Sequence, residues 1–185
     1  MLDVNTHIPL REKNIVLIGF MGAGKTTVGQ LLAQKLEREF IDADQAIEQA
    51  HGMPVTEIFQ SLGEPAFRQI EKEYIVGLCG GQRNKVISLG GGSFMQEEIR
   101  EACLGSSRVV YLDLSWDAWL RRFELLIDTR PLLQSKSVEE VEQLFNSRRP
   151  VYESGHHVVN VDTREPEELA ETIARTLRAE WERGE

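Results

Sequence analysis

Residues 19–26 of the chain read Gly19-Phe20-Met21-Gly22-Ala23-Gly24-Lys25-Thr26. They match the phosphate-binding loop pattern G-x-x-x-x-G-K-[ST] at every fixed position. The apolar run at residues 14–18 is typical of a buried strand, and the apolar spacing after residue 26 is helical. Backbone N–H groups and the helix dipole then point at one place, which forms an anion site. The alternative, a tight turn with an incidental lysine, is disfavoured by the flanking strand and helix.

The same loop predicts how a nucleotide is held. Lys25 is placed to reach the β- and γ-phosphates of a bound nucleoside triphosphate. The hydroxyl of Thr26 is placed to ligate Mg²⁺. The loop therefore predicts a nucleotide-binding protein with Mg²⁺ as its cofactor.

Strand-like and helix-like segments alternate along the chain. Apolar runs predict strands at residues 14–18, 39–41, 85–89, 108–112 and 157–161. Helices are predicted at residues 25–38, 44–50, 55–61, 65–78, 96–104, 116–126, 138–153 and 165–183, with Thr163 as the N-cap of the last. This alternation indicates an α/β fold with a five-stranded parallel sheet, helices on both faces, and ligands at the carboxyl ends of the strands. No repeat or long linker divides residues 1–185, so we expect a single domain with its core at about 14–183.

The composition excludes several classes of protein. The formal net charge is −9 and no Lys/Arg-rich run is present, which disfavours a nucleic acid partner. The apolar runs are too short to span a bilayer, so no membrane is expected. Residues 1–5 lack the features of a secretory signal, and we expect a cytoplasmic location. Cys79 and Cys103 form no CxxC motif and are interpreted as small buried apolar residues.

Two carboxylates follow the second predicted strand, in Ile41-Asp42-Ala43-Asp44. In a phosphoryl transferase, one carboxylate near the phosphate loop holds Mg²⁺ and a second accepts the proton of the attacking hydroxyl. In an extended segment, the side chains of Asp42 and Asp44 would lie on the same side. The alternative is a helix N-cap, because a helical run starts at Asp44. We interpret the pair as functional because it lies next to the phosphate-loop strand in this architecture.

Glycines and arginines complete the set of candidate residues. Gly90, Gly91 and Gly92 follow the third predicted strand. Three successive glycines favour close approach of a ligand to the backbone over a merely flexible loop. Arginine pairs bidentately with carboxylates and phosphates, so several arginines are candidates for holding an anionic group. These candidates are Arg68, Arg130, Arg148 and Arg149.

Together these motifs resemble the shikimate kinases, small P-loop kinases of aromatic amino acid biosynthesis. The resemblance runs from residue 14 to about residue 166. Its ordered motifs are GxxGxGKTT at 19–27, D-x-D at 42–44, G-E-x-x-F-R at 63–68, S-L-G-G-G at 88–92, T-R-P-L-L at 129–133 and R-x-P-x-Y at 148–152. The resemblance implies a P-loop NTPase-type three-layer fold, similar to the nucleoside monophosphate kinases. It also implies a substrate-binding region at about 42–78 and a lid at about 123–136.

The resemblance further implies roles for single residues in the ATP-dependent phosphorylation of shikimate to shikimate 3-phosphate. The ATP-binding set is Gly22, Ala23, Gly24, Lys25, Thr26 and Thr27, with Arg122 and Arg164 beside the adenine and Arg130 on the transferred phosphoryl group. The Mg²⁺ set is Thr26 together with Asp42, the latter through water. The shikimate set is Asp44, Arg68, Gly90, Gly91, Gly92 and Arg148. Catalysis would rest on Lys25, Asp44 as the base, and Arg130.

Two other functions compete with this interpretation. A different small-molecule kinase, for instance one acting on gluconate, would share the loop but not the combination of Arg68, Gly90 to Gly92 and Arg148. A non-catalytic nucleotide-binding relative is disfavoured by the intact catalytic set. We expect a monomer whose partners are the small molecules ATP and shikimate.

Two conspicuous pairs are assigned structural roles. His156 and His157 open a predicted strand, where adjacent side chains point to opposite faces, so they make a poor metal site. Trp116 and Trp119 lie three residues apart on a predicted helix and are expected to pack on the core.

Overall fold

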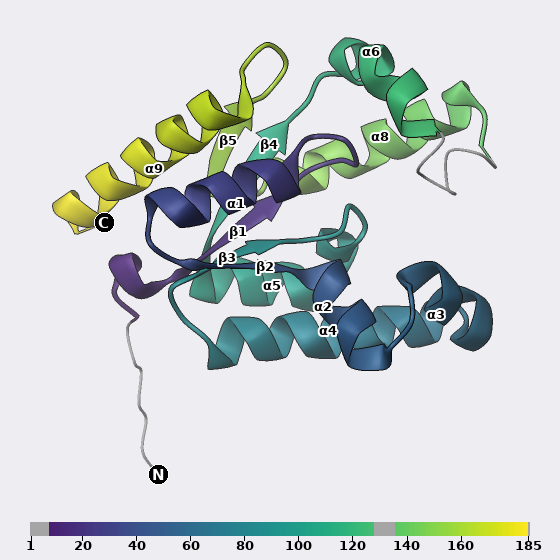
Figure 1. Cartoon of the computed structure of the whole chain (residues 1–185), viewed down its shortest axis with the longest axis horizontal. Coiled ribbons are helices and arrows are strands. Elements are labelled where there is room, and N and C mark those ends of the chain that lie inside the picture. Colours follow the sequence, from purple (N-terminus) through teal and green to yellow (C-terminus); the bar gives the residue numbers. More distant parts are fainter. Residues whose placement is uncertain (1–7, 128–135, 185) are drawn as a thin grey trace.

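A five-stranded parallel sheet forms the centre of the molecule (Figure 1). The computed structural model describes residues 8–127 and 136–184, without the side chains of residues 123–127. The strands are β1 (Asn14–Ile18), β2 (Glu39–Asp42), β3 (Lys85–Ser88), β4 (Ser107–Asp113) and β5 (His157–Asn160). Their order is β2-β3-β1-β4-β5, and every neighbouring pair is parallel. This confirms the α/β fold with a five-stranded parallel sheet that the alternation of segments predicts.

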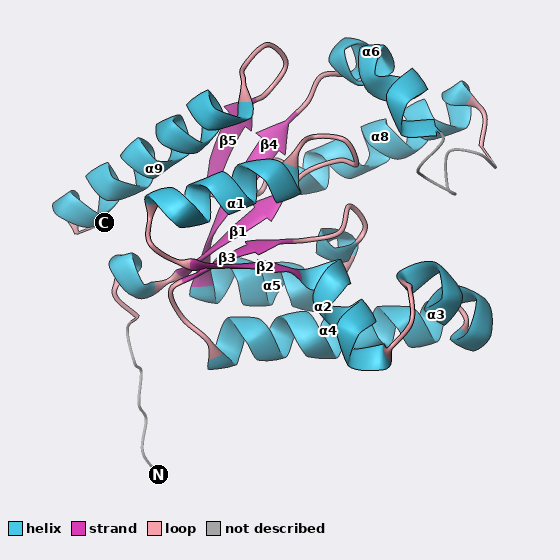
Figure 2. Ribbon diagram, viewed as in Figure 1, coloured by secondary structure: helices cyan, strands magenta, loops and turns pink. Residues whose placement is uncertain are grey.

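Helices cover both faces of the sheet (Figure 2). On one face α1 (Lys25–Lys35) packs against α9 (Pro166–Arg183), and on the other α4 (Glu64–Gly81) packs against α5 (Glu97–Ser106). The other helices of the described residues are α2 (Ala43–His51), α3 (Val55–Leu62), α6 (Trp116–Ile127) and α8 (Val138–Tyr152), and the same residues include the short 3₁₀ turns η1 (Leu10–Glu12) and η2 (Ser93–Met95). The three-layer arrangement is therefore the predicted one.

The central strands carry no polar alternation because both of their faces are covered. All five residues of β1 are buried, whereas both edge strands, β2 and β5, are partly exposed. The thiols of Cys79 on α4 and Cys103 on α5 are buried, as predicted, and lie 3.7 Å apart. Trp119 is fully buried and stacks on Trp116, with ring centroids 4.9 Å apart, which confirms that this pair packs on the core.

The order of the strands decides where a ligand binds. The connection that follows β1 leads to β2, at one edge of the sheet. The connection that follows β3 runs in the opposite direction, past β1, and leads to β4. In a parallel sheet, the crevice at such a change of direction lies outside the carboxyl ends of the two strands concerned. The segments that enter it here are the loop after β1, which holds Gly22 and Gly24, and the segment after β3, which holds Gly90 to Gly92.

Some local predictions are wrong in detail. Thr163 does not cap α9, because the helix begins at Pro166 and its N-cap position is Glu165, without a side-chain cap. The segment containing Asp42 and Asp44 is not extended throughout, because α2 begins at Ala43. Asp42 ends β2 and caps α2 with its carboxylate, and Asp44 lies in the first turn of the helix.

Within residues 8–127 and 136–184, no helix is long and apolar enough to cross a membrane. In the same ranges, no cluster of three His, Cys, Asp or Glu side chains could hold a metal ion. His156 and His157 have other partners: Nδ1 of His156 accepts a hydrogen bond from the Val109 N–H, and His157 lies 2.9 Å from Glu180.

Candidate active site

The phosphate loop connects the buried strand β1 to the first turn of α1. Gly24 is the N-cap of α1 and has a φ of 91°, a left-handed conformation that favours glycine. The Lys25 ammonium group donates to the carbonyl oxygens of Gly19, at 2.7 Å, and Phe20, at 3.1 Å. Its charge therefore lies inside the loop, beside the N-terminus of α1, where an anion is favoured.

Two side chains of α6 hold this loop from outside. The indole Nε1 of Trp119 donates to the carbonyl oxygen of Met21 at 3.0 Å. Nη1 of Arg122 donates to the carbonyl oxygen of Gly22 at 2.9 Å, and Nη2 donates to that of Val161 at 3.3 Å. With these backbone oxygens satisfied by α6, the shape of the loop is fixed by protein contacts. The contact of Trp119 with the loop was not apparent from the sequence, where its helical spacing indicated only packing on the core.

Thr26 and Asp42 are in direct contact. The Thr26 hydroxyl donates to Oδ2 of Asp42 at 3.0 Å, while Oδ1 accepts from the Gln45 N–H at 3.1 Å. A hydroxyl and a carboxylate side by side at a phosphate loop form a set of oxygen donors suited to Mg²⁺. Asp42 thus acts both as a helix cap and as a candidate metal ligand, so the two interpretations of its sequence position are compatible.

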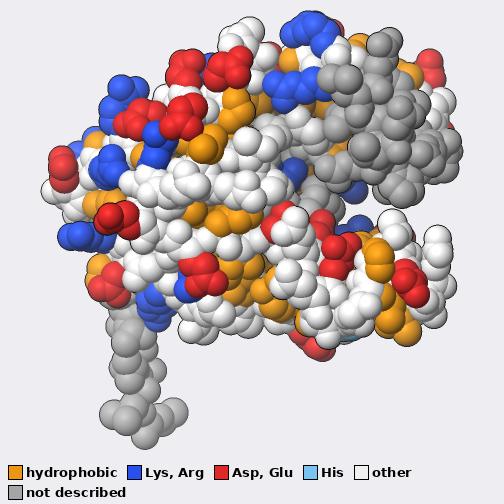
Figure 3. All heavy atoms as spheres, viewed as in Figure 1, with side chains coloured by type: hydrophobic (Ala, Val, Ile, Leu, Met, Phe, Trp, Pro, Cys, Tyr) orange, Lys and Arg blue, Asp and Glu red, His pale blue; other side chains and the backbone are white. Residues whose placement is uncertain are grey.

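Asp44 lies at the junction of two cavities. One cavity of about 470 Å³ is lined by the phosphate loop, including Lys25 and Thr26, and reaches Asp44, Gly90 and Gly91. A second, of about 550 Å³, is lined by Arg68 and Arg148 and also reaches Asp44, Gly90 and Gly91. In Figure 3 this face of the molecule is hollowed, with acidic and basic side chains on the walls of the hollow. Asp44 can therefore touch groups bound in either cavity.

The surroundings of Asp44 favour its neutral form. Burial, the main cause, and the negative charges of Glu71 and Asp42 raise its pKa from 3.8 to about 6, against the opposing charge of Lys25. A carboxylate with such a pKa is still deprotonated at neutral pH. It is a stronger proton acceptor than an ordinary aspartate, because base strength rises with pKa.

The three glycines after β3 make room for three charged side chains. A β-carbon on Gly90 would lie 2.8 Å from a carboxylate oxygen of Asp44, and one on Gly92 would lie 2.9 Å from Nη2 of Arg68. A β-carbon on Gly91 would lie 3.4 Å from Nη1 of Arg148. None of the three has a positive φ, so space rather than backbone conformation demands glycine here. The sequence predicted close approach by a ligand, and the structure shows close approach by the protein's own side chains.

Arg68 is held by a buried carboxylate that the sequence analysis missed. Nη1 of Arg68 donates to Glu71 at 2.8 Å, one turn along α4. Glu71 is 1% exposed and also accepts from Ser93 and, at 2.7 Å, from Gln96. A single glutamate on an amphipathic helix gives no sequence signal, because it looks like an ordinary surface residue. The nearby serine and glutamine come from η2 and the cap position of α5, which only the fold brings close.

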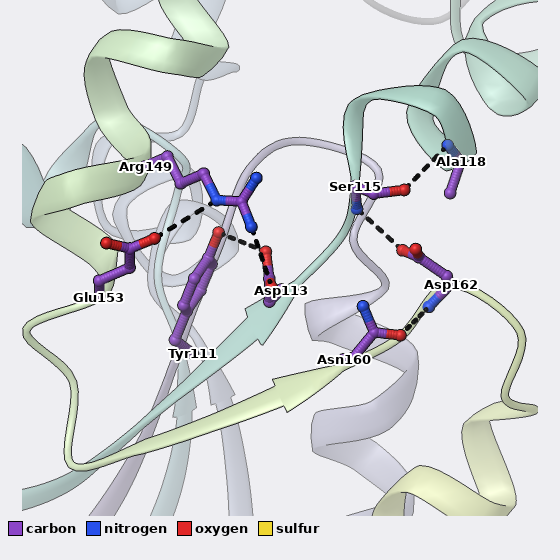
Figure 4. A network of polar contacts seen from close by, with 8 residues as sticks. All are labelled: Tyr111, Asp113, Ser115, Ala118, Arg149, Glu153, Asn160 and Asp162. Carbon is purple, nitrogen blue, oxygen red and sulfur yellow. Dashed lines mark hydrogen bonds and ion pairs between the residues drawn. The ribbon is translucent and has the colours of Figure 1, made fainter.

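Arg148 approaches the same cavity from α8. Its guanidinium lies 5.9 Å from the centre of the Phe20 ring, which places it beside the phosphate loop. Among the residues that the structure describes, no carboxylate forms an ion pair with Arg148. Neighbouring Arg149, in contrast, pairs with Asp113 and Glu153, each at 3.4 Å (Figure 4). Arg148 is thus the arginine of this pair that suits an anionic ligand.

The remaining candidates lie apart from this group. Arg164 precedes α9, is 42% exposed, and lies 3.9 Å from Glu168. It lines a separate groove beside β5 and α9 rather than either of the two cavities above. Arg130 lies outside the described residues, as do Thr129, Pro131 and most of the predicted lid.

The sequence and the fold of this chain are similar to those of known proteins. The family model described as shikimate kinase matches residues 21–178. The chain is 54% identical over 181 residues to the shikimate kinase of Bacillus subtilis, covering 98% of this chain and 97% of that protein. The structure of shikimate kinase from Acinetobacter baumannii in complex with shikimate is similar, with a TM-score of 0.82, 35% identity, and coverage of 90% and 93% of the two chains. A gluconokinase from Sinorhizobium meliloti shares the fold alone, at a TM-score of 0.51 and 17% identity over 92% and 94% of the two chains.

Proposed function

The chain belongs to the shikimate kinase family, and we propose that the two cavities meeting at Asp44 are its active site. The enzyme transfers a phosphoryl group from ATP to shikimate and forms shikimate 3-phosphate on the way to chorismate and the aromatic amino acids. The observation that carries the assignment of the site is the shared wall of the two cavities. It places one carboxylate between a phosphate-binding loop and a pair of arginines.

ATP is proposed to bind in the cavity of the phosphate loop. The N–H groups of residues 22–27 and the N-terminus of α1 would bind its phosphates, with Lys25 reaching the β- and γ-phosphates. For the adenine end we propose Arg122 and Arg164. In support, Arg122 joins the phosphate loop to the segment after β5, and that segment leads to Arg164.

Thr26 and Asp42 are proposed to hold Mg²⁺, the second directly or through water. Their contact at 3.0 Å provides the oxygen donors that this ion prefers. When bound, Mg²⁺ would neutralise charge on the phosphate oxygens. The assignment of Arg130 to the transferred phosphoryl group rests on the sequence resemblance.

Shikimate is proposed to bind in the arginine-lined cavity. Its carboxylate would pair with Arg68 and Arg148, since guanidinium groups bind carboxylates with paired hydrogen bonds. Glu71 would hold Arg68 in place for this contact. Gly90, Gly91 and Gly92 would lie along the ring of shikimate, where they leave room for both arginines and for Asp44.

The chemistry needs orientation and one proton acceptor. Asp44 would accept the proton of the attacking hydroxyl, and its pKa of about 6 leaves it ionised at neutral pH. Phosphoryl transfer otherwise depends on holding the two reactants in line and neutralising charge, which is the work proposed for Lys25 and the loop. Because one chain supplies both cavities, we propose that it acts as a monomeric, single-domain kinase. A cytoplasmic location, where ATP is available, is part of the proposal.

The direct test is release of ADP from ATP in the presence of Mg²⁺ and shikimate, with gluconate or no acceptor as controls. We expect release that depends on shikimate. A response to gluconate in its place would mean that the arginines serve another acid. No release with any acceptor would point to a nucleotide-binding protein without kinase activity.

A further inference from the structure

The R-x-P-x-Y motif contains a tyrosine to which the proposed function gives no role. Tyr152 ends α8, one turn after Arg148, and is 1% exposed. Its hydroxyl donates a hydrogen bond to the carbonyl oxygen of Gly91. A buried phenol that is hydrogen-bonded to the middle glycine of the segment after β3 is placed to control the position of that segment.

Gly91 lies where three parts of the site meet. The position of a β-carbon on Gly91 is 3.4 Å from Nη1 of Arg148, 3.6 Å from the backbone nitrogen of Met21 and 3.7 Å from the Tyr152 hydroxyl. The neighbours are therefore an arginine of α8, the phosphate loop and the tyrosine. A small displacement of Gly91 would change the space between Arg148 and the glycine segment, which is part of the proposed shikimate cavity.

The ring of Tyr152 is itself fixed from the other side. It stacks on Tyr111 of β4, with centroids 5.3 Å apart and planes at 28°. The Tyr111 hydroxyl donates to Asp113 at 3.0 Å, and Asp113 also pairs with Arg149 (Figure 4). Burial raises the pKa of Tyr152 to about 12, against the opposing effect of Arg148, so its hydroxyl keeps its proton as a donor. The tyrosine thus links the glycine segment to the rigid sheet.

We propose that Tyr152 is a positioning residue for the acceptor, acting through Gly91 rather than by touching shikimate. By holding the carbonyl oxygen of Gly91, it sets the distance between the glycine segment and Arg148, and hence the fit of the acceptor's carboxylate. This inference rests on the proposed function of the cavity and adds a residue to it.

The stacked pair of tyrosines supplies its own matched control. Tyr152→Phe and Tyr111→Phe each remove one buried hydroxyl and keep the ring, but only the first releases Gly91. For Tyr152→Phe we expect the KM for shikimate to rise about fivefold, the effect of one lost hydrogen bond, with the KM for ATP changed less than about twofold. For Tyr111→Phe we expect both KM values to stay within about twofold of wild type.

A second measurement separates positioning from general stability. The rise in melting temperature on adding shikimate should be smaller in Tyr152→Phe than in Tyr111→Phe, while the rise on adding ATP should be equal. Equal shikimate KM values in wild type and Tyr152→Phe would overturn the inference, and so would the same change in both variants. Wild type is assayed in the same series. If it turns over shikimate and Tyr152→Phe matches it, the inference alone fails, whereas no turnover by wild type removes the proposed function and the inference together.

Discussion

The proposed nucleotide side and the proposed acceptor side of the site are built in different ways. The nucleotide side is one continuous stretch of backbone, residues 19–27, between a buried strand and a helix. The acceptor side is assembled from side chains of α2, α3, α4 and α8 around the glycines after β3. The first is held by α6 through its carbonyl oxygens, and the second by buried polar contacts at Glu71. A local motif can therefore define the first, but the fold must create the second.

This difference implies that substitutions should separate the two sides. A change on the acceptor side should alter shikimate binding and leave ATP binding intact. Asp44 lines both cavities, so its substitution should act on the rate of transfer more than on the binding of either ligand.

The largest effect is expected at Asp44, where the two sides meet. Asp44→Asn keeps the shape of the side chain but cannot accept the proton, so kcat should fall by a factor of about 10² to 10⁴. Equilibrium binding of ATP, measured by calorimetry, should change little. An Asp44→Asn variant with a kcat close to that of wild type would show that no base is needed at this position.

A large effect confined to the acceptor side is expected from Arg148→Ala. Loss of a desolvated, charge-assisted contact should weaken shikimate binding by about 2 to 5 kcal/mol. Arg149→Ala is the matched control, because Arg149 is the next residue and pairs with Asp113 and Glu153 on the protein itself. Titration of both variants with shikimate and with ATP checks the prediction. Unchanged shikimate affinity in Arg148→Ala would contradict the assignment of the cavity.

A moderate effect is expected from Gly92→Ala. The added methyl group would lie 2.9 Å from Arg68, which must then move while remaining tied to Glu71. We expect the KM for shikimate to rise about tenfold, equivalent to about 1.4 kcal/mol. Gly105→Ala is the control, because no atom outside its own stretch of helix lies within 4 Å of the new methyl group there. The prediction fails if the two variants show the same steady-state kinetics.

The pH dependence of the rate should test the role of Asp44 further. Below its pKa of about 6 this residue takes up a proton, so kcat/KM for shikimate, which reflects the free enzyme, should fall about tenfold per unit of pH, with the decline starting near pH 6. The measurement is kcat/KM for shikimate between pH 5 and pH 8. A flat profile in wild type would show that the rate does not depend on the ionisation of Asp44.

The smallest effect concerns stability. The fold favours neutral Asp44, so its contribution is most favourable at low pH and is lost as pH rises through the raised pKa. Asp44→Asn should therefore be more stable than wild type at pH 7.5 by about 1 to 2 kcal/mol, with a smaller difference near pH 4. Thermal unfolding of both proteins at the two pH values tests this. An equal difference in stability at both pH values would show that the ionisation of Asp44 does not cause it.

Much of the fold could be predicted because it is encoded locally. Each of the five predicted strands is present, since apolar runs such as residues 14–18 are covered on both faces. The prediction of Thr163 as the N-cap of α9 was wrong, because several polar residues before Pro166 offer similar signals. The N-cap residue, Glu165, makes no capping hydrogen bond with its side chain. Helix ends depend on such small differences.

The site divides along the same line. Lys25 and Thr26 follow from a contiguous motif, whereas the roles of Arg68 and Arg148 needed a resemblance to a known family. Neither the motif nor the family resemblance indicated Glu71, because most of the donors around it come from other segments of the chain. The expected extended geometry of Asp42 and Asp44 was wrong, because the first carboxylate starts a helix as well as facing Thr26.

The network around Glu71 also has a thermodynamic consequence. Arg68 is a long side chain, and fixing it in one rotamer costs about 1 to 2 kcal/mol in conformational entropy. Because Glu71 orients Arg68 in the folded protein, that loss occurs during folding, and under the proposed assignment it would not recur when shikimate binds. Binding on this side should therefore carry a smaller entropic penalty than binding to an untethered arginine, so the tether would improve the affinity for shikimate.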